Sequence, residues 1–181
     1  MPRLFVALIP PATVRSELAA AATPLAGVRW TPAANLHLTM RFIGETDDAH
    51  MERYAAALAR VRVESFLLPV GGVGVFPSRG PAKVLWAGAG SGHTRLYQLR
   101  KQVDEALLTV DTGLTLPGFH PHFTLGRIGE GSDRKELTRF LEKQADFEAP
   151  PFRVAEFHLL ASELSAGRPP TYRPVESFPL A

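Results

Sequence analysis

The sequence predicts an α+β fold in which mostly antiparallel strands pack against helices. Strand and helix patterns are interspersed along the 181 residues, yet several strands follow one another directly, which favours this class over a doubly wound parallel sheet. The octet HLTMRFIG at 37–44 returns at 122–129 as HFTLGRIG, with His, Thr, Ile and Gly at the same places. Each octet belongs to a strand pattern that a helix pattern follows. We therefore expect two pseudo-symmetric lobes, with helices on the outside and a cleft between them.

The N-terminal elements follow from short apolar runs and their breakers. The run LFVALI at 4–9 is ended by two prolines, as a short buried strand would be. Residues 13–22 favour a helix that stops near Pro24. Residues 35–44 alternate, which predicts a strand with one mostly polar and one apolar face. The polar face would carry His37, Thr39, Arg41 and Ile43, and the apolar face Leu36, Leu38, Met40 and Phe42.

The middle of the chain continues with one helix and two strands. Residues 47–61 place apolar side chains at helical spacing behind Asp47 or Thr46, either of which can serve as the N-cap. The segments 66–76 and 83–89 then predict two strands around a turn rich in proline and glycine.

The C-terminal elements are read in the same way. A stripe of apolar residues predicts a helix over 93–110, and residues 122–128 predict the second His-x-Thr strand. A helix near 132–144 and two final strands, at 152–164 and 172–180, complete the chain.

The composition excludes several classes of function. An apolar share of 45% and a charged share of 21% are typical of globular domains, so we expect one domain over residues 1–181. The absence of cysteine excludes disulfides, thiolate metal sites and cysteine nucleophiles. A pI near 9.2 permits an anionic substrate. No apolar stretch is long enough to span a bilayer or to form the core of a signal peptide, so we expect a cytoplasmic protein, acting as a monomer.

The two His-x-Thr strands point to acid and base chemistry. In a strand, residues i and i+2 share a face, so each motif presents an imidazole beside a hydroxyl. Two imidazoles, one neutral and one protonated, suit in-line displacement at phosphorus. The two hydroxyls can hold the charge on the non-bridging oxygens. This scheme requires no metal ion and no cofactor.

The same residues allow other interpretations. A single His-x-Thr in a strand is most often a partly buried histidine next to a threonine that favours strands, but packing gives no reason to repeat the pair in the same register. His120 and His122 form an HPH run that invites a metal site, although no accompanying ligand motif is present. The segment GGVGVFPSRG lacks the Lys-Ser/Thr ending of a phosphate-binding loop, so we interpret it as a strand and turn.

Four segments carry a resemblance that covers nearly the whole chain. RLFVALIPP, NLHLTMRFIGE, GGVGVFPS and PHFTLGR resemble the RNA 2′,3′-cyclic phosphodiesterase family, also called 2′-5′ RNA ligases, of the two-histidine phosphoesterase superfamily. The resemblance implies metal-free opening of an RNA terminal 2′,3′-cyclic phosphate to a 2′-phosphate. It also implies that His37 is the proton donor, that His122 is the proton acceptor, and that Thr39 and Thr124 bind the phosphate.

Two further residues gain a role from the resemblance. Arg127 is similar to the family's phosphate-contacting arginine, and its fork can bind two oxygens. Its odd offset from His122 would turn it to the opposite face of a regular strand, unless a bulge near Gly126 turns it back; otherwise it is a solvated arginine. Phe42 can stack a nucleobase, as in its relatives, or can be a core residue. Arg41 can add positive potential on the face of His37, or can be a surface charge.

Alternative functions differ in substrate or in class. The same chemistry could act on small cyclic nucleotides or on ADP-ribose cyclic phosphate, and it could ligate RNA when a 5′-hydroxyl replaces water. A non-catalytic module that binds RNA ends would need cations more than a titrating pair of histidines, and a metal enzyme built on the HPH run would lose activity in EDTA. The sequence alone does not rank hydrolysis against ligation.

Overall fold

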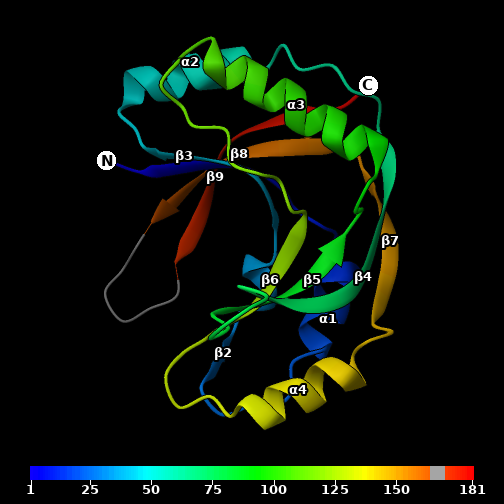
Figure 1. Ribbon diagram of the computed structural model, residues 1–181. Coiled ribbons are helices and arrows are strands. Elements are labelled where there is room, and N and C mark those ends of the chain that lie inside the picture. The colour runs from blue at the N-terminus through cyan, green and yellow to red at the C-terminus, as the bar shows by residue number, and fades with distance from the viewer. Residues whose placement is uncertain (164–169) are drawn as a thin grey trace.

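A computed structural model describes residues 1–163 and 170–181 (Figure 1). Helices and strands alternate with runs of consecutive strands, and the predicted α+β class is confirmed. The elements in chain order are β1 (Arg3–Leu8), α1 (Ala12–Ala20), β2 (Val28–Trp30), the 3₁₀ turn η1 (Ala33–Asn35), β3 (Leu38–Glu45), α2 (Asp48–Leu58), β4 (Phe66–Phe76), β5 (Val84–Ala89), α3 (Thr94–Leu108), β6 (His122–Ile128), α4 (Arg134–Lys143), β7 (Glu148–Val154), β8 (Glu156–Glu163) and β9 (Thr171–Pro179).

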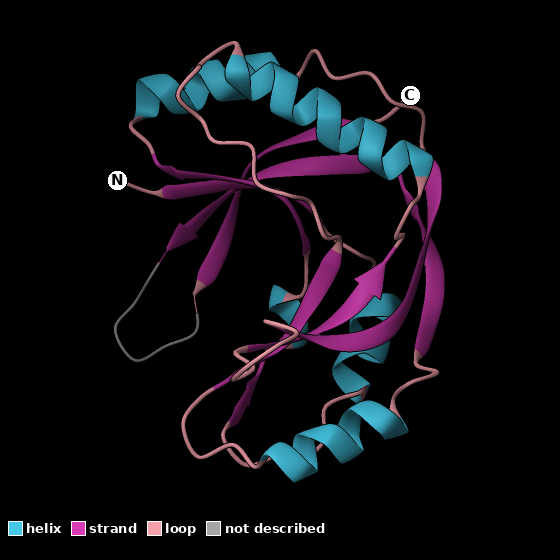
Figure 2. Cartoon of the chain, viewed as in Figure 1, coloured by secondary structure: helices cyan, strands magenta, loops and turns pink. Residues whose placement is uncertain are grey.

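One curled antiparallel sheet holds all the strands. Their order is β7-β4-β5-β6-β3-β1-β8-β9, with β2 paired to β6 beside this path. The two His-x-Thr strands, β3 and β6, are neighbours at the centre of the sheet and pair through Leu38 and Phe123. In Figure 2 the strands on either side of this junction curve toward each other, so that the sheet encloses a concave face. The concave face is where the motif side chains lie.

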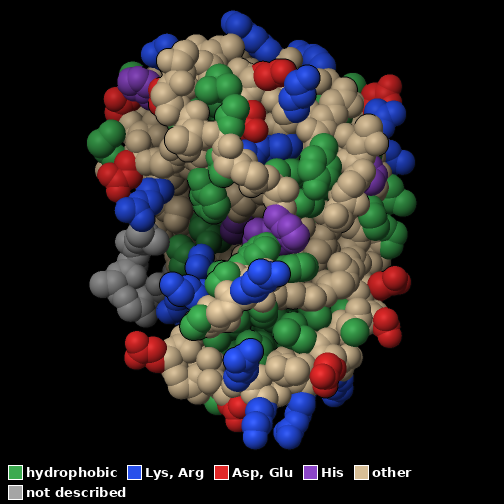
Figure 3. Space-filling view, in the orientation of Figure 1, with side chains coloured by type: hydrophobic (Ala, Val, Ile, Leu, Met, Phe, Trp, Pro, Cys, Tyr) green, Lys and Arg blue, Asp and Glu red, His purple; other side chains and the backbone are tan. Residues whose placement is uncertain are grey.

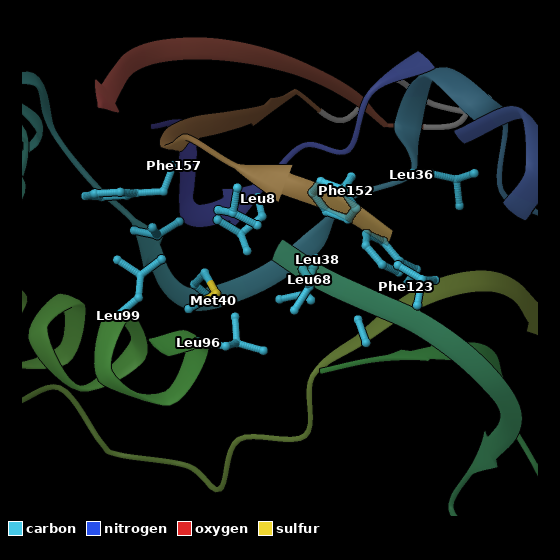
Figure 4. Close-up of a cluster of buried hydrophobic side chains, with 14 of the residues drawn as sticks. Leu8, Leu36, Leu38, Met40, Leu68, Leu96, Leu99, Phe123, Phe152 and Phe157 are labelled. Atoms are coloured by element: carbon cyan, nitrogen blue, oxygen red, sulfur yellow. The ribbon is translucent and has the colours of Figure 1, made fainter. Parts of the chain in front are cut away.

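The helices cover the sheet away from that face. Figure 1 shows α2 and α3 over the strands at the top of the view, and α1 and α4 below. In α3 the predicted apolar stripe is fully buried, at Leu96, Leu99, Val103 and Leu107. Asp47 is the N-cap of α2, since its side chain accepts from the backbone nitrogen of His50. Figure 4 shows Met40 and Leu38 of β3 pointing into the same core as the α3 leucines. None of the helices in the described residues is long and apolar enough to cross a membrane.

One predicted strand needs correction, and one short strand was not predicted. The segment predicted as one strand at 152–164 is two strands, β7 and β8, which Ala155 separates; β7 begins earlier, at Glu148, and residue 164 lies outside the described residues. The prediction failed because only Ala155 separates β7, which pairs with β4, from β8, which pairs with β1, so the apolar pattern is almost unbroken. The short edge strand β2 was not predicted, because three residues are too few to show a period.

The two faces predicted for residues 35–44 hold as far as Met40 and were wrong at Arg41 and Phe42. The register of β3 against β1 slips twice, once at Met40 and once at Ile43, and each slip leaves one residue of β3 unpaired. A bulge reverses the alternation of side chains that follows it. Arg41 is therefore buried, at 3% exposure, whereas Phe42 is 71% exposed. The interpretations of Arg41 as a cleft or surface charge and of Phe42 as a core residue are both incorrect.

Candidate active site

Pairing of β3 with β6 brings the two His-x-Thr motifs together. Leu38 and Phe123 are register partners, and both side chains are fully buried in the core. Side chains alternate along a strand, so the residues on either side of this pair lie on the concave face. Continuing the antiparallel register by one residue in each direction places His37 across from Thr124, and Thr39 across from His122. All four side chains are partly exposed. Each histidine therefore faces a threonine of the other motif.

The two imidazoles are oriented by the same kind of hydrogen bond. Nδ1 of His37 lies 2.7 Å from the carbonyl oxygen of Asn35, and Nδ1 of His122 lies 2.6 Å from the carbonyl oxygen of His120. A carbonyl can only accept, so each Nδ1 carries the proton and donates it. In the neutral ring this leaves Nε2 without a proton and free to take one. The Asn35 side chain in turn donates to the carbonyl of Pro170, at 2.8 Å.

Burial and the charge of a neighbouring histidine lower the pKa of both histidines. Burial is the largest cause for His37; the bond to the Asn35 carbonyl opposes it, and the charge of His122 lowers the pKa further. Burial is also the largest cause for His122, opposed by the His120 carbonyl and reinforced by the charge of His120. The effect of the His122 charge on the pKa of His37 places the two rings near each other. At neutral pH a lowered pKa favours the unprotonated ring that a general base needs.

Aromatic side chains surround His37. The ring of Phe5 lies 5.1 Å from its ring and that of Tyr172 lies 4.9 Å away, edge to face. Phe5 also contacts the exposed Phe42, at 6.1 Å. The rings of Phe5, Tyr172 and Phe42 therefore form an apolar wall on the His37 side, with Phe42 at its open end. The sequence analysis identified Phe42 but missed Phe5 and Tyr172, whose only signal was an aromatic residue in a strand.

A second aromatic group lies on the His122 side. Phe76 meets both His122, at 5.1 Å, and His120, at 5.0 Å, edge to face. Trp86 lies 5.2 Å from Phe76. A Cβ added at Gly74 would come within 2.3 Å of the indole of Trp86, so this glycine makes room for the ring. The glycine-rich segment is thus a strand, as predicted, and it leaves room for Trp86. The positions of Trp86 and Phe76 beside the histidines were not predicted.

A bulge turns Arg127 onto the face of the histidines. Trp86 of β5 pairs with Thr124, and Leu85 pairs with Gly126, so Leu125 is the extra residue of β6. Arg127 is exposed, whereas its neighbour Ile128 is buried. Burial raises the pKa of Tyr172, and the charge of Arg127 opposes that rise, so Arg127 lies near the wall beside His37. The predicted bulge is confirmed, one residue before Gly126. Arg41, in contrast, is outside the site and pairs with Asp104.

Within the described part of the chain, no three His, Asp or Glu side chains come together as a metal site would need. His120 and His122 of the HPH run are 6.3 Å apart between ring centroids, and Nδ1 of His122 is already engaged by a carbonyl. His120 instead packs edge to face against the ring of Trp86. Among the described residues, the site thus consists of two imidazoles, two hydroxyls, an arginine and aromatic rings.

Comparisons with known proteins identify relatives of this chain in sequence and in fold. A model of the LigT like Phosphoesterase family matches residues 9–86 and 89–171. The RNA 2′,3′-cyclic phosphodiesterase of Aeropyrum pernix is 30% identical over 158 residues, which cover 87% of this chain and 88% of the relative. The crystal structure of TT0787 of Thermus thermophilus superposes with a TM-score of 0.81 at 28% identity, covering 98% and 97% of the two chains. Escherichia coli LigT complexed with 3′-AMP superposes with a TM-score of 0.79 at 26% identity, covering 99% of each chain.

A curled antiparallel sheet with two His-x-Thr strands paired at its centre defines a two-histidine phosphoesterase. The family match extends over both strands and over most of the elements that carry the site. This chain belongs to the LigT-like phosphoesterase family.

Proposed function

We propose that this protein hydrolyses the 2′,3′-cyclic phosphate at an RNA end to a 2′-phosphate. The relative from Aeropyrum pernix is named for activity on this group. The observation that carries the proposal is the pairing of the two motifs, each of which sets an oriented imidazole opposite a hydroxyl. We further propose that the site lies within one domain, residues 1–181, in a cleft between two lobes, and that a monomer is active. Both His-x-Thr strands belong to one continuous sheet, which supports this proposal.

The proposed reaction is an in-line displacement. Nε2 of His122 takes a proton from water as the water oxygen attacks phosphorus, and the bond between phosphorus and O3′ breaks. Nε2 of His37, protonated in the reactive form, gives its proton to O3′. The 2′-phosphate remains on the ribose. The donor and acceptor roles follow the family resemblance, and the lowered pKa of His122 suits a base.

The remaining groups hold the phosphate and the nucleoside. The hydroxyls of Thr39 and Thr124 donate to the non-bridging oxygens, whose charge grows in the transition state. The guanidinium of Arg127 is placed to hold phosphate oxygens, and Phe42 can stack the base next to O3′. If the 5′-hydroxyl of a second RNA replaces water, the same proton transfers form a 2′-5′ linkage. Ligation is thus part of the proposal, and it requires neither ATP nor a metal ion.

The decisive experiment uses an oligonucleotide that ends in a 2′,3′-cyclic phosphate, with and without EDTA. We expect conversion to the 2′-phosphate at the same rate in both. The product is identified by chromatography against 2′- and 3′-phosphate standards, and His122→Ala protein serves as the blank. Formation of the 3′-phosphate, or loss of activity in EDTA that Mg²⁺ or Zn²⁺ restores, would contradict the proposal. Tight binding of the oligonucleotide without conversion would favour a module that only binds RNA ends.

A further inference from the structure

Arg29 and Arg127 are direct cross-strand partners in β2 and β6. Partners in an antiparallel pair point to the same face of the sheet, so both guanidiniums extend from the face that carries His122 and Thr124. Val28 and Trp30, on either side of Arg29, point the other way and pack against the core. Figure 3 shows Lys and Arg side chains beside the histidines on this side of the molecule.

Strand β2 is held firmly, so the position of Arg29 is defined. The indole nitrogen of Trp30 donates to the carbonyl of Thr23, at 3.0 Å, and its ring lies 5.7 Å from that of Phe140 in α4. The backbone nitrogen of Thr31 donates to the carbonyl of Leu125, the bulge residue of β6, at 2.8 Å. The same bulge that turns Arg127 toward the site is thus bonded to the strand that carries Arg29.

This pair of cations is uncompensated by the described residues. Arg29 and Arg127 are both exposed, and neither forms an ion pair with a carboxylate in residues 1–163 or 170–181. Like charges directly opposite each other in a sheet repel. An anion between them would remove the repulsion, and the forked guanidinium matches the oxygens of a phosphate.

We propose that Arg29 binds the phosphodiester that precedes the terminal cyclic phosphate of an RNA, while Arg127 lies between this phosphodiester and the reacting phosphate. From Thr124 to Arg127 the strand advances about 7–10 Å, and Arg29 lies one strand further on. When the reacting phosphate lies between the two motifs, Arg29 is too far away to contact it. Arg29 can instead contact the next phosphate along the RNA chain. This assignment rests on the proposed function and deepens it, because a mononucleoside cyclic phosphate has no such group. The site then selects RNA ends over small cyclic nucleotides.

The test compares three substrates, of which only one carries a charged phosphodiester before the cyclic phosphate. They are a dinucleotide ending in a 2′,3′-cyclic phosphate, the same dinucleotide with an uncharged methylphosphonate linkage, and a mononucleoside 2′,3′-cyclic phosphate. We expect Arg29→Ala to lower kcat/KM for the charged dinucleotide roughly two- to fivefold, the range of a solvent-exposed ion contact. The other two substrates should be unaffected. Arg53→Ala, which removes an exposed arginine of α2 outside the site, is the matched control and should change nothing.

The other outcomes would overturn the inference. An equal loss of kcat/KM on all three substrates would mean that Arg29 acts on the reacting phosphate. If kcat/KM is unchanged on every substrate, Arg29 is only a surface charge. If the wild-type protein converts none of the substrates, the proposed function fails, and the inference is then decided by affinity for the dinucleotide 2′-phosphate. Arg29→Ala should weaken that affinity and reduce the slope of log K against log salt by roughly 0.7, the value for one single-strand phosphate contact. An unchanged affinity and slope would contradict it.

Discussion

The guanidinium of Arg100 in α3 donates a hydrogen bond to the carbonyl of Met40, the residue at which β3 first slips against β1. Arg100 also bonds Asp104, at 2.7 Å, and Asp104 lies 3.4 Å from Arg41. Arg41 in turn donates to the carbonyl of Thr115, in the loop that leads to β6. One buried network thus links the bulge that exposes Phe42 to the segment before His122.

The first prediction is that Asp104→Asn weakens both the fold and the site. Asp104 is the carboxylate that pairs with the two buried guanidiniums, Arg41 and Arg100. Its removal leaves them uncompensated, which costs about 3 kcal/mol in comparable buried pairs. We expect a lower urea midpoint and a lower kcat. The matched control is Glu105→Gln in the exposed Lys101–Glu105 pair of the same helix, which should change neither. If Asp104→Asn leaves the urea midpoint and kcat unchanged, as Glu105→Gln should, the network is dispensable.

Much of this arrangement was predictable from the sequence, and the failures have definable causes. The repeated His-x-Thr places four polar side chains on two strands, and α3 shows its buried stripe in its spacing. A strict period of two, however, cannot show a bulge, and the slip at Met40 that turns Phe42 outward was not predicted. The slip at Leu125, which turns Arg127, was indicated only by the neighbouring Gly126. Contacts between distant segments, such as Tyr172 with His37, leave no local signal at all.

The second prediction concerns the two histidines. If His37 and His122 each carry one proton transfer, replacing either with Ala should lower kcat by roughly 10²–10⁴. The double variant should lose little more than the single variants, because the two groups act as a unit. Both side chains are partly exposed, so the melting temperature should stay near that of the wild type. A single variant that keeps its activity would remove that histidine from the mechanism.

The third prediction separates the hydroxyls from the shape of their strands. Thr39→Val and Thr124→Val keep the branched side chain and delete one donor, and we expect kcat to fall roughly 10- to 1,000-fold. Serine restores the hydroxyl, so Thr39→Ser and Thr124→Ser should recover most of the loss. Initial rates on one cyclic-phosphate oligonucleotide are sufficient for this comparison. Wild-type kinetics in both valine variants would assign the threonines to packing alone.

The fourth prediction is an acidic optimum for kcat/KM. The reactive form has His122 neutral and His37 protonated, and it is most abundant between the two pKa values. Both pKa values are lowered from about 6.5, chiefly by burial. The kcat/KM profile reports the free enzyme, so its maximum should lie below pH 6.5. An anionic phosphate raises the pKa of His37, so the basic limb of kcat should lie at higher pH than that of kcat/KM. An optimum of kcat/KM above pH 7 would contradict these pKa directions.

The fifth prediction is that the enzyme accepts all four terminal bases. The groups beside His37 that can meet a base are rings, Phe42 above all, and stacking is available to every base. Sequence-specific recognition of single-stranded RNA requires hydrogen bonds to base edges, and the motifs supply no converging set of amides or carboxylates. We therefore expect kcat/KM to vary by no more than about tenfold among four oligonucleotides that differ only in the base bearing the cyclic phosphate. Phe42→Leu should raise KM for all four alike, since it removes a stacking surface that every base uses. A thousandfold preference for one base would instead require a dedicated base pocket, and Phe42→Leu would then affect the four substrates unequally.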